Sequence, residues 1–112
     1  MKKKEKSACI NFKIDLDVNN VPEKIVWDAT DNNQTNNDAK AVMISIWDGV
    51  AKSSLKIDLW TKEMMAEEMK FFTFQILDSL SDTYKRAVGD EKIAKEIKDF
   101  AEHIGKSSNV LK

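Results

Sequence analysis

The chain has 112 residues, of which 42% are hydrophobic and 33% are charged, and its formal net charge is −1. This length predicts one domain with a modest core, and a charge so close to zero excludes a general attraction to nucleic acid or to anionic membranes. The single Cys9 excludes an internal disulfide bond, and the sequence has no cluster of cysteine and histidine for zinc. We therefore expect neither a metal nor a cofactor.

The first residues do not have the pattern of an export signal. Residues 1–6 are basic, but the apolar core of a signal peptide does not follow them. No stretch approaches the roughly 20 apolar residues that a membrane helix needs. The sequence thus predicts a cytoplasmic protein without direct membrane insertion, with a disordered basic tail over residues 1–7.

The chain then begins with a predicted β-hairpin. From Ile10 to Leu16 apolar and polar residues alternate, which is typical of a half-buried strand. Residues 18–22 hold two asparagines and the only proline, so they predict a turn. In the strand that follows, Ile25 and Trp27 are expected to point inward.

Residues 30–38 are polar and rich in asparagine, which predicts a solvated loop without a calcium site. Residues 39–52 follow as a predicted helix whose apolar arc spans about 200°, wider than one-sided packing requires. We expect this helix to touch two layers, namely its own sheet and another helix or subunit. A third strand is predicted over residues 55–60.

Two more helices complete the predicted elements. The first covers residues 62–88, with Thr61 as its N-cap and Gly89 as the residue that ends it. Its apolar stripe consists of Met65, Met69, Phe72, Ile76, Leu80 and Ala87. The second begins after the cap Asp90 and ends at Gly105, and residues 106–112 are predicted to be disordered.

These elements predict an α+β fold of order β-β-α-β-α-α. We expect a single domain over residues 8–105, in which helices cover one face of a small antiparallel three-stranded sheet. The order 2-1-3, with the first strand central, would make every neighbouring pair of strands antiparallel.

Three groups of residues resemble a known family. The segment 19–31, Asn-Asn-Val-Pro-Glu-Lys-Ile-Val-Trp-Asp-Ala-Thr-Asp, resembles the signature hairpin of the gliding-motility protein family GldC. Residues 56–62, with 68–70, are similar to its second block, and residues 82–83 and 89–91 to its third. The resemblance spans about residues 9–100. It implies a small cytoplasmic protein that works with the bacterial gliding machinery, and it implies no catalytic residues.

The residues themselves offer little for catalysis. His103 is expected on the polar side of the last helix, and Cys9 has no evident base beside it. The three glycines form no phosphate-binding loop. We therefore expect that the protein is not an enzyme.

A few large apolar residues occupy unexpected positions, which suggests a protein–protein surface. These residues are Trp60, Met64, Phe71 and Phe74. The alternative is that a second layer within the monomer covers them. A predicted helix of about 27 residues would also exceed the diameter of so small a domain. For both reasons we expect a homodimer, and the family resemblance implies that it joins protein partners of the gliding machinery as an adaptor.

A second hypothesis is a carrier for small apolar ligands or peptides. Its groove would lie between the sheet and the helices and would be lined by Met43, Met65 and Met69. Methionine adapts to ligands of varied shape, although the same three residues are also explained by ordinary core packing.

Overall fold

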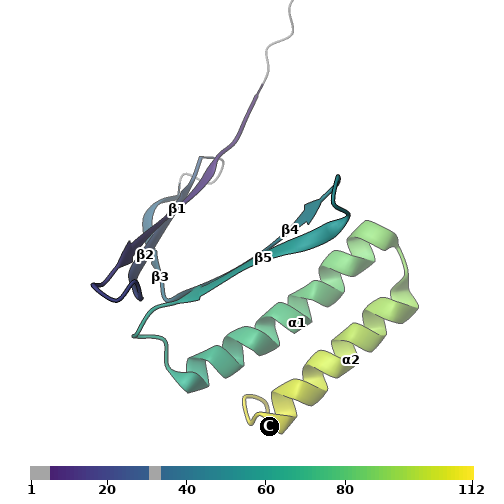
Figure 1. The fold of residues 1–112 in the computed structure, drawn as a ribbon. Helices are drawn as coiled ribbons and strands as arrows, with labels where there is room; N and C mark the ends of the chain where they lie inside the picture. Colours follow the sequence, from purple (N-terminus) through teal and green to yellow (C-terminus); the bar gives the residue numbers. More distant parts are fainter. Residues whose placement is uncertain (1–5, 31–33) are drawn as a thin grey trace, which may run out of the picture. The chain divides into compact units, whose positions relative to one another are not determined.

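The computed structural model describes residues 6–30 and 34–112 and divides the chain into two compact units (Figure 1). Residues up to Met64 form the strand unit, and residues from Met65 form the helix unit. The predicted single domain over residues 8–105 would span both units, and it stays a prediction. The predicted tail 1–7 falls mostly on residues 1–5, which lie outside the described residues.

The strand unit contains β1 (Ile10–Leu16), β2 (Pro22–Ala29), β3 (Gln34–Ala39), β4 (Ala41–Asp48) and β5 (Ser53–Trp60). The helix unit contains α1 (Ala66–Val88) and α2 (Glu91–Ser107). The α+β class is confirmed, and the order of the elements agrees roughly with the predicted one. The single three-stranded sheet of order 2-1-3 is wrong, because the strands form an antiparallel sheet β1-β2-β3 and a separate pair β4-β5.

The first hairpin, β1–β2, is confirmed. Its register pairs Phe12 with Trp27 and Ile14 with Ile25. Pro22 is the first residue of β2, where a strand tolerates a residue that cannot donate a backbone hydrogen bond. Ile25 is fully buried, as expected for a residue on the inner side of the central strand.

β3 replaces part of the predicted loop 30–38. Residues 34–38 lie in this strand, which pairs with β2 through Ile25 and Ala39 and through Trp27 and Asn37. Residues 31–33 lie outside the described residues. A strand at a sheet edge needs hydrogen bonds on one side only and requires no apolar face, so a polar composition does not prevent it.

β4 replaces the predicted helix 39–52, and this prediction is wrong. β-Branched residues recur at every second position, Val42, Ile44 and Ile46, as a strand requires. Apolar residues at the alternate positions, such as Trp47, widened the apolar arc on the helical wheel. The pairing with β5 ends in a tight turn at Asp48.

Asp48 organises that turn. Its Oδ1 accepts hydrogen bonds from the backbone N–H groups of Ala51 and Val50, at 3.1 and 2.9 Å. These two hydrogen bonds lower the pKa of Asp48. Lys52, in the left-handed conformation at φ 53°, donates its N–H to the Asp48 carbonyl and closes the turn. Asp48 thereby fixes the register of β4 against β5.

α1 begins at Ala66, four residues after the predicted start. Thr61 is not its N-cap, because Thr61 is buried in the strand unit and donates its N–H to the Lys40 carbonyl at 2.8 Å. Glu68 instead accepts a hydrogen bond from the N–H of Met65 at the helix start. The predicted end is confirmed: Gly89 has φ 79°, and its N–H bonds to the Lys85 carbonyl.

α2 begins as predicted, with the Asp90 carboxylate accepting a hydrogen bond from the Ile93 N–H at 3.0 Å. It continues to Ser107 rather than ending at Gly105. Beyond it, Val110 and Leu111 both donate to the Gly105 carbonyl at 2.9 Å. In place of a disordered segment 106–112, the structure has a last helical turn and a return of the chain onto α2.

Small residues bring α1 and α2 together. Ser81 is buried and donates its hydroxyl to the Ala94 carbonyl at 2.6 Å. Ala94, Ala101 and Gly105 are the buried residues of α2. Because these side chains are small or absent, the two backbones approach closely.

Candidate functional site

The β4–β5 hairpin presents a face on which three successive cross-strand pairs are aliphatic. In the register of the two strands, residues that lie opposite each other point to the same face. This aliphatic face consists of three pairs: Val42 with Leu59, Ile44 with Ile57, and Ile46 with Leu55. Leu55 is 60% exposed, Ile46 47% and Ile57 40%. A two-stranded hairpin with such a face is only marginally stable by itself, so the face requires a further layer.

The opposite face of the hairpin is mixed. It carries Met43, Trp47 and Trp60 together with the polar residues Ser45, Ser54, Lys56 and Asp58. Trp47 and Trp60 are both exposed, and the Lys56 ammonium lies 2.9 Å from the Asp58 carboxylate. Large apolar side chains therefore reach solvent on both faces of one hairpin.

A small cavity lies at the end of β5. Its volume is about 210 Å³, and its lining residues are Val21, Pro22, Asp58, Leu59 and Trp60. Successive residues of a strand point to opposite faces. A cavity lined by three successive residues of β5 therefore lies along the backbone edge of that strand. We call it the Trp60 pocket. It lies where the segments 19–31 and 56–62, which carry the family resemblance, meet.

An ion pair next to this pocket joins the β1–β2 turn to the end of β5. The Lys62 ammonium contacts the Asp17 carboxylate, whose side chain is only 10% exposed. Asp17 Oδ1 also accepts hydrogen bonds from the N–H groups of Val21 and Asn19, at 2.9 and 2.8 Å. The hydrogen bond from Lys62, followed by those from Val21 and Asn19, lowers the pKa of Asp17 from 3.8 to about 2.

This ion pair predicts a loss of stability in acid. The folded chain holds Asp17 ionised, so the stabilising contribution is complete above the ordinary pKa of 3.8 and disappears as the pH falls toward 2. We expect Asp17→Asn to lower the melting temperature at neutral pH, and this difference from the unmodified chain to shrink between pH 3.8 and 2. Thermal unfolding across this pH range measures it. Asp15→Asn, at an exposed position in β1, is the control, and a difference that persists at pH 2 would contradict the prediction.

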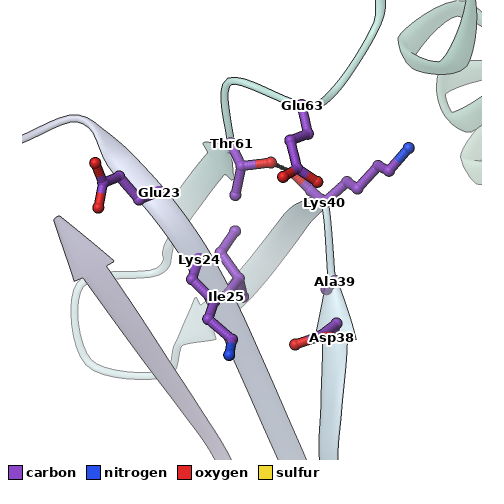
Figure 2. A pocket seen from close by; sticks show the side chains of 8 residues that line it. All are labelled: Glu23, Lys24, Ile25, Asp38, Ala39, Lys40, Thr61 and Glu63. Carbon is purple, nitrogen blue, oxygen red and sulfur yellow. Dashed lines mark hydrogen bonds between the residues drawn. The ribbon is translucent and has the colours of Figure 1, made fainter. Parts of the chain in front are cut away.

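A second cavity, of about 440 Å³, lies where β2, β3 and the residue after β5 meet (Figure 2). It includes the buried Ile25 and Thr61, and Thr61 Oγ1 donates to the Lys40 carbonyl at 3.3 Å. Figure 2 shows Glu23 and Glu63 on either side of Thr61. The charged residues that line the cavity are Glu23, Lys24, Asp38, Lys40 and Glu63. With both signs of charge present, the cavity does not select strongly for an anion or a cation.

The predicted interaction residues fall into both units. Trp60 is 54% exposed at the end of β5, and Met64 is half-buried in the segment that follows. Phe71 is 45% exposed on α1 and meets the half-buried Phe74 edge to face, with ring centroids 6.2 Å apart. Trp60 and Phe71 therefore have the exposure expected of a docking surface. The four residues together stay a predicted surface, since two of them belong to the strand unit and two to the helix unit.

Phe74 has a role that the sequence did not reveal. A Cβ atom on Gly105 would come within 2.9 Å of Phe74 Cδ1 and 2.6 Å of Leu111 Cδ1. Phe74 therefore packs against α2 and the returning chain end. This contact explains why Phe74 lies off the main apolar stripe of its helix.

The three methionines of the alternative groove are also divided between the units. Met43 lies half-buried in β4, Met65 is exposed at the start of α1, and Met69 is half-buried one turn later. The carrier hypothesis with its groove stays a prediction.

The two candidate reactive residues, His103 and Cys9, are both accessible to solvent. His103 is exposed on α2, with its ring centroid 6.2 Å from that of Phe100. Cys9 is an exposed free thiol whose backbone pairs with Thr30. Within residues 6–30 and 34–112, no three side chains of His, Cys, Asp or Glu come together as a metal site would require.

The aliphatic face is what sequence reasoning missed. Its residues in β4 fall in the segment predicted to be a helix, and those in β5 fall in the third strand of the predicted sheet. The alternation of Val42, Ile44 and Ile46, followed by Asp48 and Gly49 as turn residues, was the available signal.

Fold and surface together define a small α+β protein whose most prominent surface feature is a strand hairpin with exposed apolar side chains. The model of the family described as "Gliding motility-associated protein GldC-like" matches residues 22–110. The chain therefore belongs to the GldC-like family, and the resemblance seen in the sequence is confirmed. Searches of curated proteins and of solved structures found no match. In the part of the chain that the structure describes, neither helix has the length and apolar character needed to cross a membrane.

Proposed function

We propose that this protein is a non-enzymatic cytoplasmic adaptor of the gliding machinery that docks on protein partners through its β4–β5 hairpin. The observation that carries the proposal is the concentration of exposed large apolar residues on this one hairpin. These residues are Ile46, Trp47, Leu55, Ile57 and Trp60. Membership of the GldC-like family supports the biological setting, since the family is described as associated with gliding motility.

The geometry supports docking better than catalysis. Trp47 and Trp60 are exposed on the mixed face, and tryptophan is enriched among the residues that dominate binding energy at protein interfaces. Lys56 and Asp58 lie between them on the same face and would give a partner polar contacts that fix its orientation. Self-association of the chain is part of the same proposal.

The test compares capture of partners by two variants. We expect Trp47→Ser combined with Trp60→Ala to reduce the recovery of specific partners from gliding cells by about tenfold or more, because two aromatic anchors are lost. Quantitative mass spectrometry of pull-downs measures the recovery. Val18→Ser removes another exposed apolar side chain, from the β1–β2 turn, and should leave recovery unchanged.

Circular dichroism separates docking from folding. Both variants should retain the spectrum of the unmodified chain, because the substituted side chains are exposed. Equal recovery of partners by the double variant and the unmodified chain would refute docking through this hairpin. The combination Trp60→Ala with Phe71→Asp tests the surface predicted from the sequence in the same way.

A further inference from the structure

The free edge of β5 has a defined set of backbone groups. Thr61 donates its N–H to the Lys40 carbonyl, which identifies these two residues as a hydrogen-bonded pair. Such pairs recur at every second position of an antiparallel ladder, so Leu59, Ile57 and Leu55 direct their backbone groups toward β4. The residues that alternate with these, Ser54, Lys56, Asp58 and Trp60, direct their backbone groups to the other edge of β5. Among the described strands, β5 has no neighbour except β4.

The sequence along this edge reads almost the same in both directions. The segment Leu55-Lys56-Ile57-Asp58-Leu59 is symmetric about Ile57 in its apolar residues and inverts its charge from Lys56 to Asp58. An antiparallel neighbour with this same sequence would therefore place each charge opposite its counter-charge. Only a pairing centred on Ile57 does so twice.

We propose that two copies of this chain pair through β5, antiparallel, around a two-fold axis at Ile57. Lys56 then lies opposite Asp58 of the second copy, and Asp58 opposite its Lys56, so that two oppositely charged pairs form across the strands. Leu55 meets Leu59 of the second copy, and Trp60 meets the small Ser54. This deepens the proposed function and rests on it, since it assigns self-association to one edge of the docking hairpin.

The pairing agrees with four features of the free chain. It supplies hydrogen-bond partners to the outward backbone groups of β5, and it joins two marginal hairpins into one four-stranded sheet. It also makes the aliphatic faces of the two copies continuous, because Ile57 lies beside Ile57 of the second copy. Finally, Ser54 of the second copy arrives at the Trp60 pocket, where a small side chain finds room.

Exchanging the charges of Lys56 and Asp58 tests the pairing of β5 with its copy. Lys56→Asp and Asp58→Lys each create two like-charge pairs across the axis, and we expect each to raise the dimer dissociation constant by about tenfold or more. The double variant restores both oppositely charged pairs and should return the constant close to that of the unmodified chain. Lys13→Asp makes the same charge change at an exposed position of β1 and should have no effect. Sedimentation velocity over a range of concentrations measures the constants of the full chain.

A cysteine experiment tests the register independently. Residues opposite each other in a non-hydrogen-bonded pair have Cα atoms about 4.5 Å apart, within the range of a disulfide bond. In a Cys9→Ser background, Ile57→Cys should form a disulfide-linked dimer on mild oxidation. Leu55→Cys, which faces Leu59 of the second copy and not itself, should not.

The results separate this inference from the proposed function. The pairing would be overturned if the chain were monomeric at tens of micromolar, or if the double variant at positions 56 and 58 did not restore the dissociation constant. It would also be overturned if oxidation cross-linked the chains through position 55 rather than 57. If Ile57→Cys does not fold, the charge exchange decides alone. A monomeric chain that still loses its partners when Trp47 and Trp60 are replaced would refute the β5 pairing and leave the adaptor role standing.

Discussion

Ile25→Ala is expected to lower the free energy of unfolding of the strand unit by about 2–5 kcal/mol, the range for large-to-small changes in protein cores. Ile25 is fully buried, and it lies in β2, which pairs on both sides, between Ile14 of β1 and Ala39 of β3. Neighbouring side chains are held by two sheet ladders, so they cannot easily close the space that the substitution opens.

Tryptophan fluorescence during denaturation with urea measures this effect. All three tryptophans, Trp27, Trp47 and Trp60, belong to the strand unit, so their signal reports on that unit. Ile10→Ala makes a similar truncation at an exposed position of β1 and should cost much less. Equal losses for the two variants would show that Ile25 is not the centre of this core.

Ala101→Leu should destabilise the helix unit by about 1–3 kcal/mol or more, which is the usual cost of overpacking. Ala101 is fully buried on α2, between the buried Ala94 and Gly105. About two turns before Ala101, the hydrogen bond of 2.6 Å from Ser81 to the Ala94 carbonyl holds the two helices close, and Ala101 lies on the same buried side of α2. Three additional carbon atoms have no space there and would push the helices apart.

Thermal unfolding followed by far-UV circular dichroism reports on the helices directly. The matched control is Ala87→Leu, the same substitution at an exposed position of α1, which should change the melting temperature little. If the control lowered the melting temperature as much as Ala101→Leu, helix propensity rather than close packing would be responsible.

The parts of the fold that the sequence predicts correctly are those for which a single pattern of neighbouring residues is decisive. The clean alternation from Ile10 to Leu16 predicted β1, and the capping residues Asp90 and Gly89 fixed the start of α2 and the end of α1. Each signal acts through neighbours in the chain, because a cap bonds within one helical turn and a strand alternates at every residue.

The errors arose where long-range pairing decides the structure. β4 has apolar residues on both faces, so its alternation was hidden, and only pairing with β5 distinguishes it from a helix. β3 has almost no apolar residues and exists because β2 offers it a ladder of backbone hydrogen bonds. The assignment of Thr61 as a cap failed for the same reason, since its hydrogen bond goes to Lys40, distant in sequence.

The candidate site was predictable in part. Trp60 and Phe71 stood out because large apolar residues occupied positions expected to face solvent, and both are exposed. The aliphatic face could not be derived, because it depends on the register between β4 and β5. Phe74 could not be assigned either, because Gly105 and Leu111, which it packs against, lie in and beyond the next helix, distant in sequence.

Gly105 also has a consequence for how this lineage can change over generations. Any larger residue there would collide with Leu111 and Phe74, at 2.6 and 2.9 Å from a first added carbon. A larger residue at 105 is therefore accommodated only if both of these side chains move aside or are themselves replaced by smaller ones. Substitutions at 74, 105 and 111 are therefore expected to be coupled, so that the effect of a change at 105 depends on which residues stand at the other two positions.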